Sequence, residues 1–368
     1  MLLPSYKDFG EKNAFFKPDS EYPDNKILDI AAFDEWYDFF SKPYLDPVKK
    51  FDFFFRGMKE ARYQLFNSAQ REWLANSVVQ WRKDSDYLSF IKKLIEEAKA
   101  LKIFEKVLAY HQIDYATEAD FPILSILQHY GAPTPLMDWS YNLDVALYFA
   151  TEDVNTVTAS EDINGYFSIY VIKKSSQSGA LYNIFDYSSG KFPNLEVFKK
   201  EKFAPNASSN VVCYISDFEM NPQQAPKIKS IIPSQQIPRR QRPVTTYYNQ
   251  NIIPQEGFFI FNPYPDKPLE ACFSNTSRMD ASVSYGSSKK KLAPFLCYNI
   301  RKDLAEYIRR KIKFKGIDNG YIYPDLKTFV KMAKDNALNS IIAPAPTKAK
   351  AARKVVPSKK MSRVKTAN

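Results

Sequence analysis

Apolar residues recur at three- and four-residue spacing in several stretches of the chain, which is the pattern of amphipathic helices. One of these stretches places Leu88, Ile91, Ala98 and Leu101 on a single stripe, with lysines and glutamates between them. Helices are therefore predicted at about 28–41, 69–108, 120–130, 142–150, 301–313 and 325–338. The third is expected to end at Gly131, because glycine readily adopts the left-handed conformation that follows many helices.

Short runs of aromatic and β-branched residues predict strands. They lie at 51–55, where Gly57 is expected to close the strand, and at 166–172, 211–215, 258–261 and 295–300, with a short extended segment at 134–138. Helices first and strands later, around one mixed β-sheet, are typical of the α+β class. The early strands must join the later ones, so one domain is expected at 28–342. An irregular N-terminal arm precedes it at 1–27, and a disordered basic tail follows at 343–368.

The composition argues against several kinds of protein. Only 10 glycines occur, and neither a G-x-G-x-x-G nor a Walker pattern is present, so a glycine-rich phosphate loop is not expected. Two histidines, His111 and His129, and three widely spaced cysteines argue against a metal site. The sparse cysteines fit a reduced cytoplasmic protein. The chain has no basic leader segment and no run of about 18 apolar residues, so neither a secretion signal nor a membrane span is expected.

The positive charge is concentrated at the C-terminus. The net charge is +11, and residues 347–368 contain eight lysines and arginines and no acid, which leaves +3 for the other 346 residues. Such a segment cannot form a core, and it can neutralise phosphates on nucleic acid. Weak, non-specific contact with nucleic acid is therefore one interpretation of the tail. A solubilising extension is the other.

Polar residues set into apolar surroundings predict a site, because an unpaired buried charge or amide is costly. Arg56 follows Phe53-Phe54-Phe55, and it is interpreted either as a guanidinium fork for a phosphate or carboxylate, or as a structural partner of Asp138. His129, in the last turn of its helix, is either an acid, base or ligand contact, or a hydrogen-bond donor to a nearby carbonyl. Gln128 is either an amide that contacts a base or ribose, or a clamp.

The segment after this helix adds further candidates. Asp138 is interpreted as a general base or as the partner of Arg56, and Trp139 as a stacking surface or a core residue. Gln255 and Glu256 are adjacent on a predicted strand, so only one of them can face the site. A loop with Arg239, Arg240, Arg242, Tyr247 and Tyr248 is either a phosphate- and base-binding surface or an exposed turn.

These motifs resemble the FRG domain, a bacterial family named after its Phe-Arg-Gly sequence. The resemblance rests on Phe55-Arg56-Gly57, Gln128-His129-Tyr130-Gly131 and Leu136-Met137-Asp138-Trp139-Ser140, and it extends from about 28 to 336. It includes a Gln-x-Gly-x-Phe segment at 255–259. Asn251 departs from the pattern, because the family usually has an arginine four residues before that glutamine. If the arginine binds an anion in relatives, this role is expected to be lost here or to move to Arg239, Arg240 or Arg242.

The same residues are more distantly similar to ADP-ribosyltransferases of the arginine-serine-glutamate type. Arg56, the segment Asp138-Trp139-Ser140 and Gln255-Glu256 follow one another in the order of that family's motifs. There is no Ser-Thr-Ser, however, and Gln255 stands where a glutamate is expected. A carboxylate stabilises the oxocarbenium-like transition state of glycosidic cleavage better than a neutral amide does. Glu256 facing the site would therefore favour the transferase interpretation.

The resemblances imply an ADP-ribosyltransferase-like enzyme that binds a nucleotide such as NAD, in a bacterial stress or phage-defence setting. The expected site residues are Arg56, His129, Asp138, Gln255 and Glu256 for the chemistry, and Arg56, Gln128, Tyr130, Trp139 and Ser140 for the ligand. The alternative is a non-catalytic module that binds a nucleotide, nucleic acid or protein through the same cleft. The sequence leaves the acceptor and the oligomeric state open.

Overall fold

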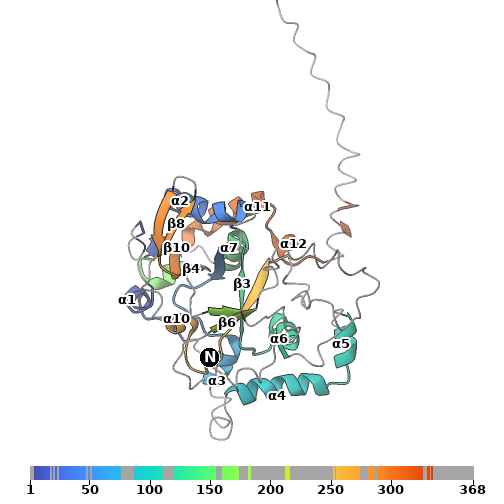
Figure 1. The fold of residues 1–368 in the computed structure, drawn as a ribbon. Coiled ribbons are helices and arrows are strands. Elements are labelled where there is room, and N and C mark those ends of the chain that lie inside the picture. Colours follow the sequence, from blue (N-terminus) through green and yellow to red (C-terminus); the bar gives the residue numbers. More distant parts are fainter. Residues whose placement is uncertain are drawn as a thin grey trace, which may run out of the picture. The chain divides into compact units, whose positions relative to one another are not determined.

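The computed structural model describes residues 4–16, 19, 21–22, 25–46, 49, 52–75, 87–110, 120–154, 160–173, 181–183, 212–215, 252, 254–273, 281–285, 288–325, 330–331 and 333–334 (Figure 1). The chain divides into two units, Met1–Pro324 and Asp325–Asn368. The sheet and the helices described below belong to the first. Of the helix expected at 325–338, the structure describes residue 325 and two residue pairs, 330–331 and 333–334, and these pairs are helical. The basic tail lies outside the described residues.

An eight-stranded mixed sheet forms the centre of the first unit, with the strand order β1-β10-β4-β2-β3-β7-β6-β5. The strands are β1 (Lys26–Ile27), β2 (Phe53–Met58), β3 (Leu136–Ser140), β4 (Tyr166–Lys173), β5 (Leu181–Asn183), β6 (Val212–Ile215), β7 (Gly257–Phe261) and β10 (Phe295–Arg301). The pairs β1–β10 and β5–β6 are parallel, and the other pairs are antiparallel. Strands β8 (Ala281–Tyr285) and β9 (Ser288–Leu292) form a separate hairpin. The α+β class is confirmed, and each strand predicted from an aromatic or β-branched run is found in the eight-stranded sheet.

The described helices are α1 (Phe9–Asn13), α2 (Ile30–Ser41), α3 (Ser68–Leu74), α4 (Tyr87–Ala100), α5 (Phe104–Tyr110), α6 (Asp120–His129), α7 (Leu143–Thr151), α10 (Leu269–Cys272), α11 (Ala305–Phe314) and α12 (Asn319–Ile322), with 3-10 turns η2 (Lys42–Leu45), η5 (Ile163–Gly165) and η10 (Lys302–Leu304). The predicted helices at 28–41, 120–130, 142–150 and 301–313 are confirmed as α2, α6, α7 and α11. The helix predicted at 69–108 is interrupted, and Leu101, expected on its apolar stripe, is 59% exposed between α4 and α5.

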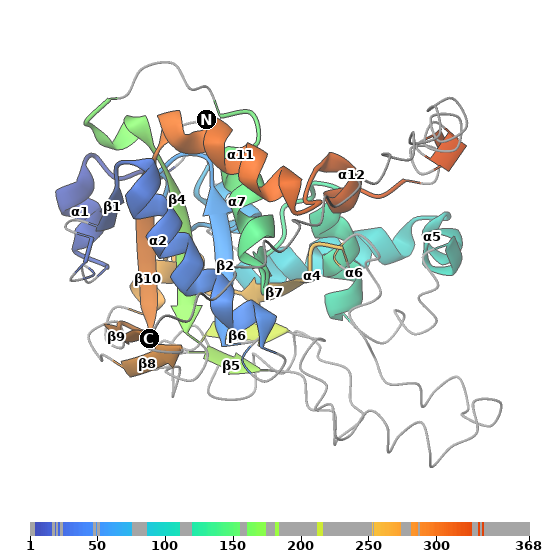
Figure 2. The same ribbon diagram turned by 90° about the horizontal axis from the view of Figure 1, so that it is seen from above.

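The core consists of layers on both faces of the sheet. Helices α2, α7 and α11 pack together over β10, β4 and β2 on one face, where Phe53 and Phe55 are buried (Figures 1 and 2). Helices α3, α4 and α6 pack against β3 and β7. Phe54 points to the opposite face, where it joins Trp139 and Tyr170. The all-phenylalanine run of β2 is explained by this burial on both faces, because successive side chains of a strand alternate between them.

The N-terminal segment is an integral part of the first unit. The expectation of an irregular arm at 1–27 is wrong for α1 and β1, and β1 pairs with β10 at the edge of the sheet. Lys12 in α1 is fully buried. Its Nζ donates to the carbonyl of Ala61 at 2.7 Å, Oγ of Ser168 at 2.8 Å and Oδ1 of Asn299 at 2.8 Å. Burial lowers the pKa of Lys12, and the three acceptors compensate for the loss of water.

Candidate functional site

A cavity of about 470 Å³ opens where β2 and β3 separate. These neighbouring strands pair only at Phe55 and Ser140, whereas β2 pairs with β4, and β3 with β7, along their whole lengths. We call the space the Arg56 cavity. Its lining includes Arg56, Gly57, Lys59, Tyr63, Arg71, Gln128, His129, Asp138, Trp139, Ser140, Ala146, Phe149, Gln255 and Tyr323. Four residues that the sequence placed in one site, Arg56, Gln128, His129 and Asp138, therefore do line one cavity.

Gly57 brings α7 against β2 at the wall of this cavity. A Cβ added to Gly57 would lie 1.9 Å from the carbonyl oxygen of Ala146 and 2.8 Å from the backbone nitrogen of Ala150. No larger residue fits without a shift of the helix. The prediction that Gly57 closes the strand is wrong, because β2 continues through it to Met58. The glycine is required here for close packing rather than for a turn.

Arg56 is held by its neighbour's main chain. Its Nη1 donates to the backbone carbonyl of Asp138, so the expected partner residue is found, but the bond does not go to the carboxylate. Nε of Arg56 is buried and has no hydrogen-bond partner among the described residues. Desolvation lowers the pKa of Arg56, an effect that the negative charge of Asp138 opposes. The guanidinium therefore retains donor capacity at the cavity.

A second arginine, which the sequence did not single out, faces the same space. Arg71 lies on α3, and its guanidinium has no hydrogen bond or ion pair with any residue that the structure describes. Burial lowers its pKa, and the positive charge of Arg71 contributes to the lowered pKa of Arg56. No local motif distinguishes Arg71 from the other basic residues of the chain. Only the packing of α3 brings it to the cavity.

The carboxylate of Asp138 is held by a chain of hydrogen bonds. The hydroxyl of Thr134 donates to Oε1 of Gln128, and Nε2 of Gln128 donates to Oδ2 of Asp138 at 2.9 Å. The glutamine thus acts as a clamp in this structure. His129 also lines the cavity, and its ring contacts that of Tyr130 with centroids 5.1 Å apart. Tyr130 is not among the lining residues, and its side chain is 66% exposed.

The remaining candidates on β3 contribute differently. Trp139 is buried and packs against Phe295, with ring centroids 6.1 Å apart, yet it also lines the cavity. Its buried Nε1 has no hydrogen-bond partner within the described part of the chain. Ser140 also lines the cavity, but its Oγ donates to the backbone carbonyl of Gln255 at 2.7 Å. That hydroxyl therefore fastens the segment before β7.

Gln255 and Glu256 lie in different surroundings, as predicted, but they lie in a turn and not on strand β7. The prediction that they lie on a strand is wrong, because β7 begins at Gly257 and residues 254–256 form a turn. Gln255 lines the Arg56 cavity and Glu256 does not. The carboxylate of Glu256 instead accepts hydrogen bonds from Tyr44 and Asn142. Asp138 is the one carboxylate among the described residues that line the cavity.

Some residues named from the sequence lie outside the described residues. These are His111, Asn251, and the loop with Arg239, Arg240, Arg242, Tyr247 and Tyr248, for which phosphate and base binding was one interpretation. Within the described ranges, no group of three or more histidines, cysteines, aspartates or glutamates is arranged to hold a metal ion. Nor does any described helix have the length and apolar character needed to cross a membrane.

Comparison with known proteins identifies one part of the chain. Residues 52–159 match the family model of the FRG domain. The match supports the FRG family for the segment that runs from β2 past α7, which contains Arg56, Gln128, His129 and Asp138. The turn at 254–256 lies outside the matched segment. No curated protein and no solved structure matches the chain.

Proposed function

We propose that the Arg56 cavity binds a phosphate-bearing ligand of the nucleotide class, with NAD as the first candidate. The observation that carries the proposal is the buried Nε of Arg56, which has no hydrogen-bond partner in the described part of the chain, beside a second partly buried arginine, Arg71. A buried guanidinium is costly unless its donors are satisfied. An anion would satisfy both arginines, and the planar fork of arginine suits the oxygens of a phosphate.

The other charges at the cavity strengthen this interpretation. Lys59 is paired with Glu152 at 3.3 Å and Asp153 at 3.5 Å, so its charge is already compensated. Asp138 supplies one negative charge for the two arginines, and one of its oxygens accepts from Gln128. The described lining residues therefore carry an excess of positive charge, which attracts an anionic ligand and disfavours a cationic one.

The size and the rings of the cavity fit a ligand with an aromatic base. Its volume of about 470 Å³ falls within the usual range of small-molecule sites, roughly 300–1,000 Å³. Tyr63, Phe149 and Tyr323 contribute aromatic surface to the wall. Tyr323 is 42% exposed and contacts Phe149, with ring centroids 6.4 Å apart, so one ring remains accessible for stacking.

The geometry favours binding over glycosyl transfer. The transferase interpretation requires a carboxylate beside the bond to be cleaved, and Glu256 is engaged elsewhere. A transferase would have to use Asp138, with Gln255 as a neutral partner. The non-catalytic module, which was the alternative from the sequence, therefore becomes the preferred form of the proposal. A role in bacterial stress or phage defence rests only on the resemblance to the FRG family.

Calorimetric titration with NAD, ADP-ribose and inorganic phosphate tests the binding site. Replacing Arg56 by lysine retains the charge but removes the fork, and should weaken binding by about tenfold to a hundredfold, the effect of one charge-assisted hydrogen bond. The matched control is Arg310→Lys, because Arg310 is exposed, pairs with Glu306 and does not line the cavity. Absence of binding to all three probes by the unaltered protein would refute the proposal, as would equal affinities of the two variants.

Melting temperatures and nicotinamide release complete the test. If Arg56 is a core clamp, Arg56→Lys should lower stability by about 3–5 kcal/mol; if it is a ligand contact, the melting temperature should barely change. Incubation with NAD and cell lysate distinguishes a transferase from a non-catalytic binding module. Nicotinamide release that Asp138→Asn abolishes would establish the enzyme, whereas NAD binding without release would establish the module.

A further inference from the structure

Glu256 has a backbone conformation that needs support. Its φ is +44°, in the left-handed region that residues other than glycine rarely occupy. The residue lies between Gln255, which lines the Arg56 cavity, and Gly257, the first residue of β7. The course of the chain at Glu256 thus decides where Gln255 is placed. The contacts that hold Glu256 therefore also influence the position of Gln255 at the cavity.

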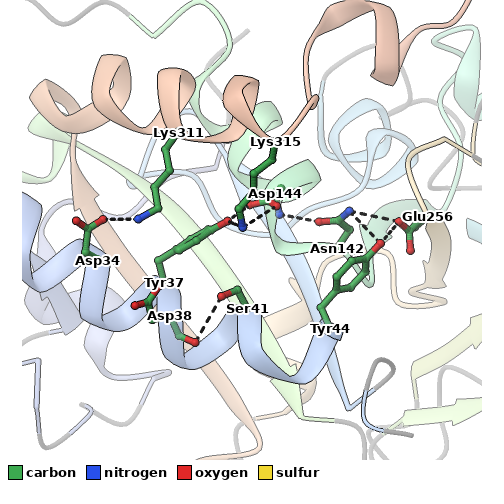
Figure 3. Close-up of polar contacts among 10 residues, drawn as sticks. All are labelled: Asp34, Tyr37, Asp38, Ser41, Tyr44, Asn142, Asp144, Glu256, Lys311 and Lys315. Carbon is green, nitrogen blue, oxygen red and sulfur yellow. Dashed lines mark hydrogen bonds and ion pairs between the residues drawn. The ribbon is translucent and has the colours of Figure 1, made fainter. Parts of the chain in front are cut away.

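The side chain of Glu256 is fixed from two elements. The hydroxyl of Tyr44, on η2, donates to Oε1 of Glu256, and Nδ2 of Asn142 lies 3.3 Å from the same oxygen (Figure 3). Nδ2 of Asn142 is also 3.3 Å from the hydroxyl oxygen of Tyr44. The three polar groups form a closed triangle. We call Tyr44, Asn142 and Glu256 the Glu256 latch.

The backbone of the same turn is fixed by the end of β3. Oγ of Ser140 donates to the carbonyl of Gln255 at 2.7 Å, and the N–H of Tyr141 donates to the carbonyl of Glu256 at 3.1 Å. Residues 140–142 thus contact both the backbone and the side chain of the turn, and Tyr44 adds a contact from a distant part of the chain. Within the Glu256 latch, Tyr44 is the member that comes from an element distant in sequence, η2.

The latch is connected to three helices. Asn142 is the N-cap of α7, and its Oδ1 accepts the N–H of Asp144 at 2.9 Å. The carboxylate of Asp144 accepts from the hydroxyl of Tyr37 on α2 and pairs with Nζ of Lys315, which follows α11, at 3.6 Å (Figure 3). Polar contacts thus run from α2 and α11 through the start of α7 to the turn beside the cavity.

We propose that Glu256 is a positioning residue of the Arg56 cavity, whose carboxylate, held by Tyr44 and Asn142, keeps the left-handed turn that presents Gln255 to the ligand. This proposal rests on the proposed function. It gives the adjacent residues separate roles, because Gln255 contacts the ligand and Glu256 acts through it. It also accounts for an acidic residue that lies next to the cavity but does not line it.

Hydrogen exchange tests the latch without any ligand. Tyr44→Phe removes the donor to Glu256 and should speed exchange of the amide of Tyr141, which donates to the carbonyl of Glu256, by about tenfold, as local opening becomes easier. The control is Tyr307→Phe, because Tyr307 donates to Asp34 at 2.7 Å in a contact that does not involve the turn. Exchange at the turn that is equal in the two variants would overturn the proposal, whether or not a ligand is known.

Titration then tests whether the cavity uses the latch. Glycine adopts φ above zero without strain and alanine does not, so ADP-ribose affinity should fall in the order unaltered protein, Glu256→Gly, Glu256→Ala. Inorganic phosphate, which needs only the arginines, should bind all three equally. Equal losses in the two variants would indicate a direct contact and overturn the positioning role. Failure of the unaltered protein to bind any probe would instead refute the proposed function. The hydrogen-exchange experiment would then still show whether Tyr44 stabilises the turn.

Discussion

Replacing Gly57 by alanine should destabilise the protein much more than a glycine-to-alanine change in an unobstructed position. The added Cβ would lie 1.9 Å from the carbonyl oxygen of Ala146, where ordinary contacts begin at 3.4 Å. The two nearest atoms, that oxygen and the nitrogen of Ala150 at 2.8 Å, belong to the backbone of α7, and the third, Cβ of Ala150 at 2.9 Å, is fixed to it. No side chain can rotate away, so the helix must move by roughly 1.5 Å to reach van der Waals separation.

The size of the effect follows from what α7 packs against. Its inward residues Leu143, Val145, Ala146, Leu147 and Ala150 are all buried in the core formed with α2 and α11. Overpacking that forces backbone shifts costs about 1–3 kcal/mol, and occasionally more. Because the whole helix must shift here, we expect a loss of about 3 kcal/mol or more in the free energy of unfolding.

Urea unfolding followed by circular dichroism measures this loss, and Gly131→Ala is the matched control. Gly131 has φ of +84°, and a Cβ there would meet nothing within 4 Å. Its replacement should cost only the strain of the left-handed conformation, about 1–2 kcal/mol. A midpoint for Gly57→Ala at or above that of Gly131→Ala would refute the steric argument. It would mean that β2 and α7 can separate at little cost.

Two further predictions concern the ends of the chain. Lys12→Met removes the donor to Ala61 and should lower the unfolding free energy by about 3 kcal/mol, as buried acceptors lose a partner; a urea midpoint equal to that of the unaltered protein would contradict this. Deleting 347–368 removes eight basic residues, and should flatten the salt dependence of DNA binding by roughly 0.9 in logarithmic slope for each phosphate that the tail neutralises. Identical slopes for the full-length and truncated proteins would leave the tail without a nucleic-acid role.

Local patterns in the sequence were sufficient to predict most of the elements. The helix at 28–41 is confirmed as α2, because the apolar spacing that predicts it repeats within a few residues. The helix predicted at 142–150 is likewise confirmed as α7, and Gly131 has the positive φ expected after a helix. The early strands do join the later ones, since β2 and β3 lie in the middle of the sheet.

Contacts between distant segments could not be predicted in the same way. Lys12 lies in a short polar stretch, and nothing near it in the sequence indicates that three acceptors from other elements surround its amine. Arg71 reaches the cavity only because α3 packs there. The environment of Glu256 depends on Tyr44, 212 residues earlier in the chain. The sequence predicted that Gln255 and Glu256 face opposite ways because side chains alternate along a strand. They do lie in different surroundings, but the cause is the turn at 254–256 and not strand alternation.

The Phe-Arg-Gly sequence can be understood from the alternation of a single strand. Phe55 and Gly57 face the same side of β2, where the phenylalanine joins the core and the glycine admits the backbone of α7. Arg56, between them, reaches the main chain of β3 across the gap where the two strands separate. Close approach at Gly57 also makes Ala146 and Phe149 part of the cavity wall. The three adjacent residues therefore act together. Phe55 and Gly57 allow α7 to pack against β2 and form the cavity wall, and Arg56 places its guanidinium at that cavity.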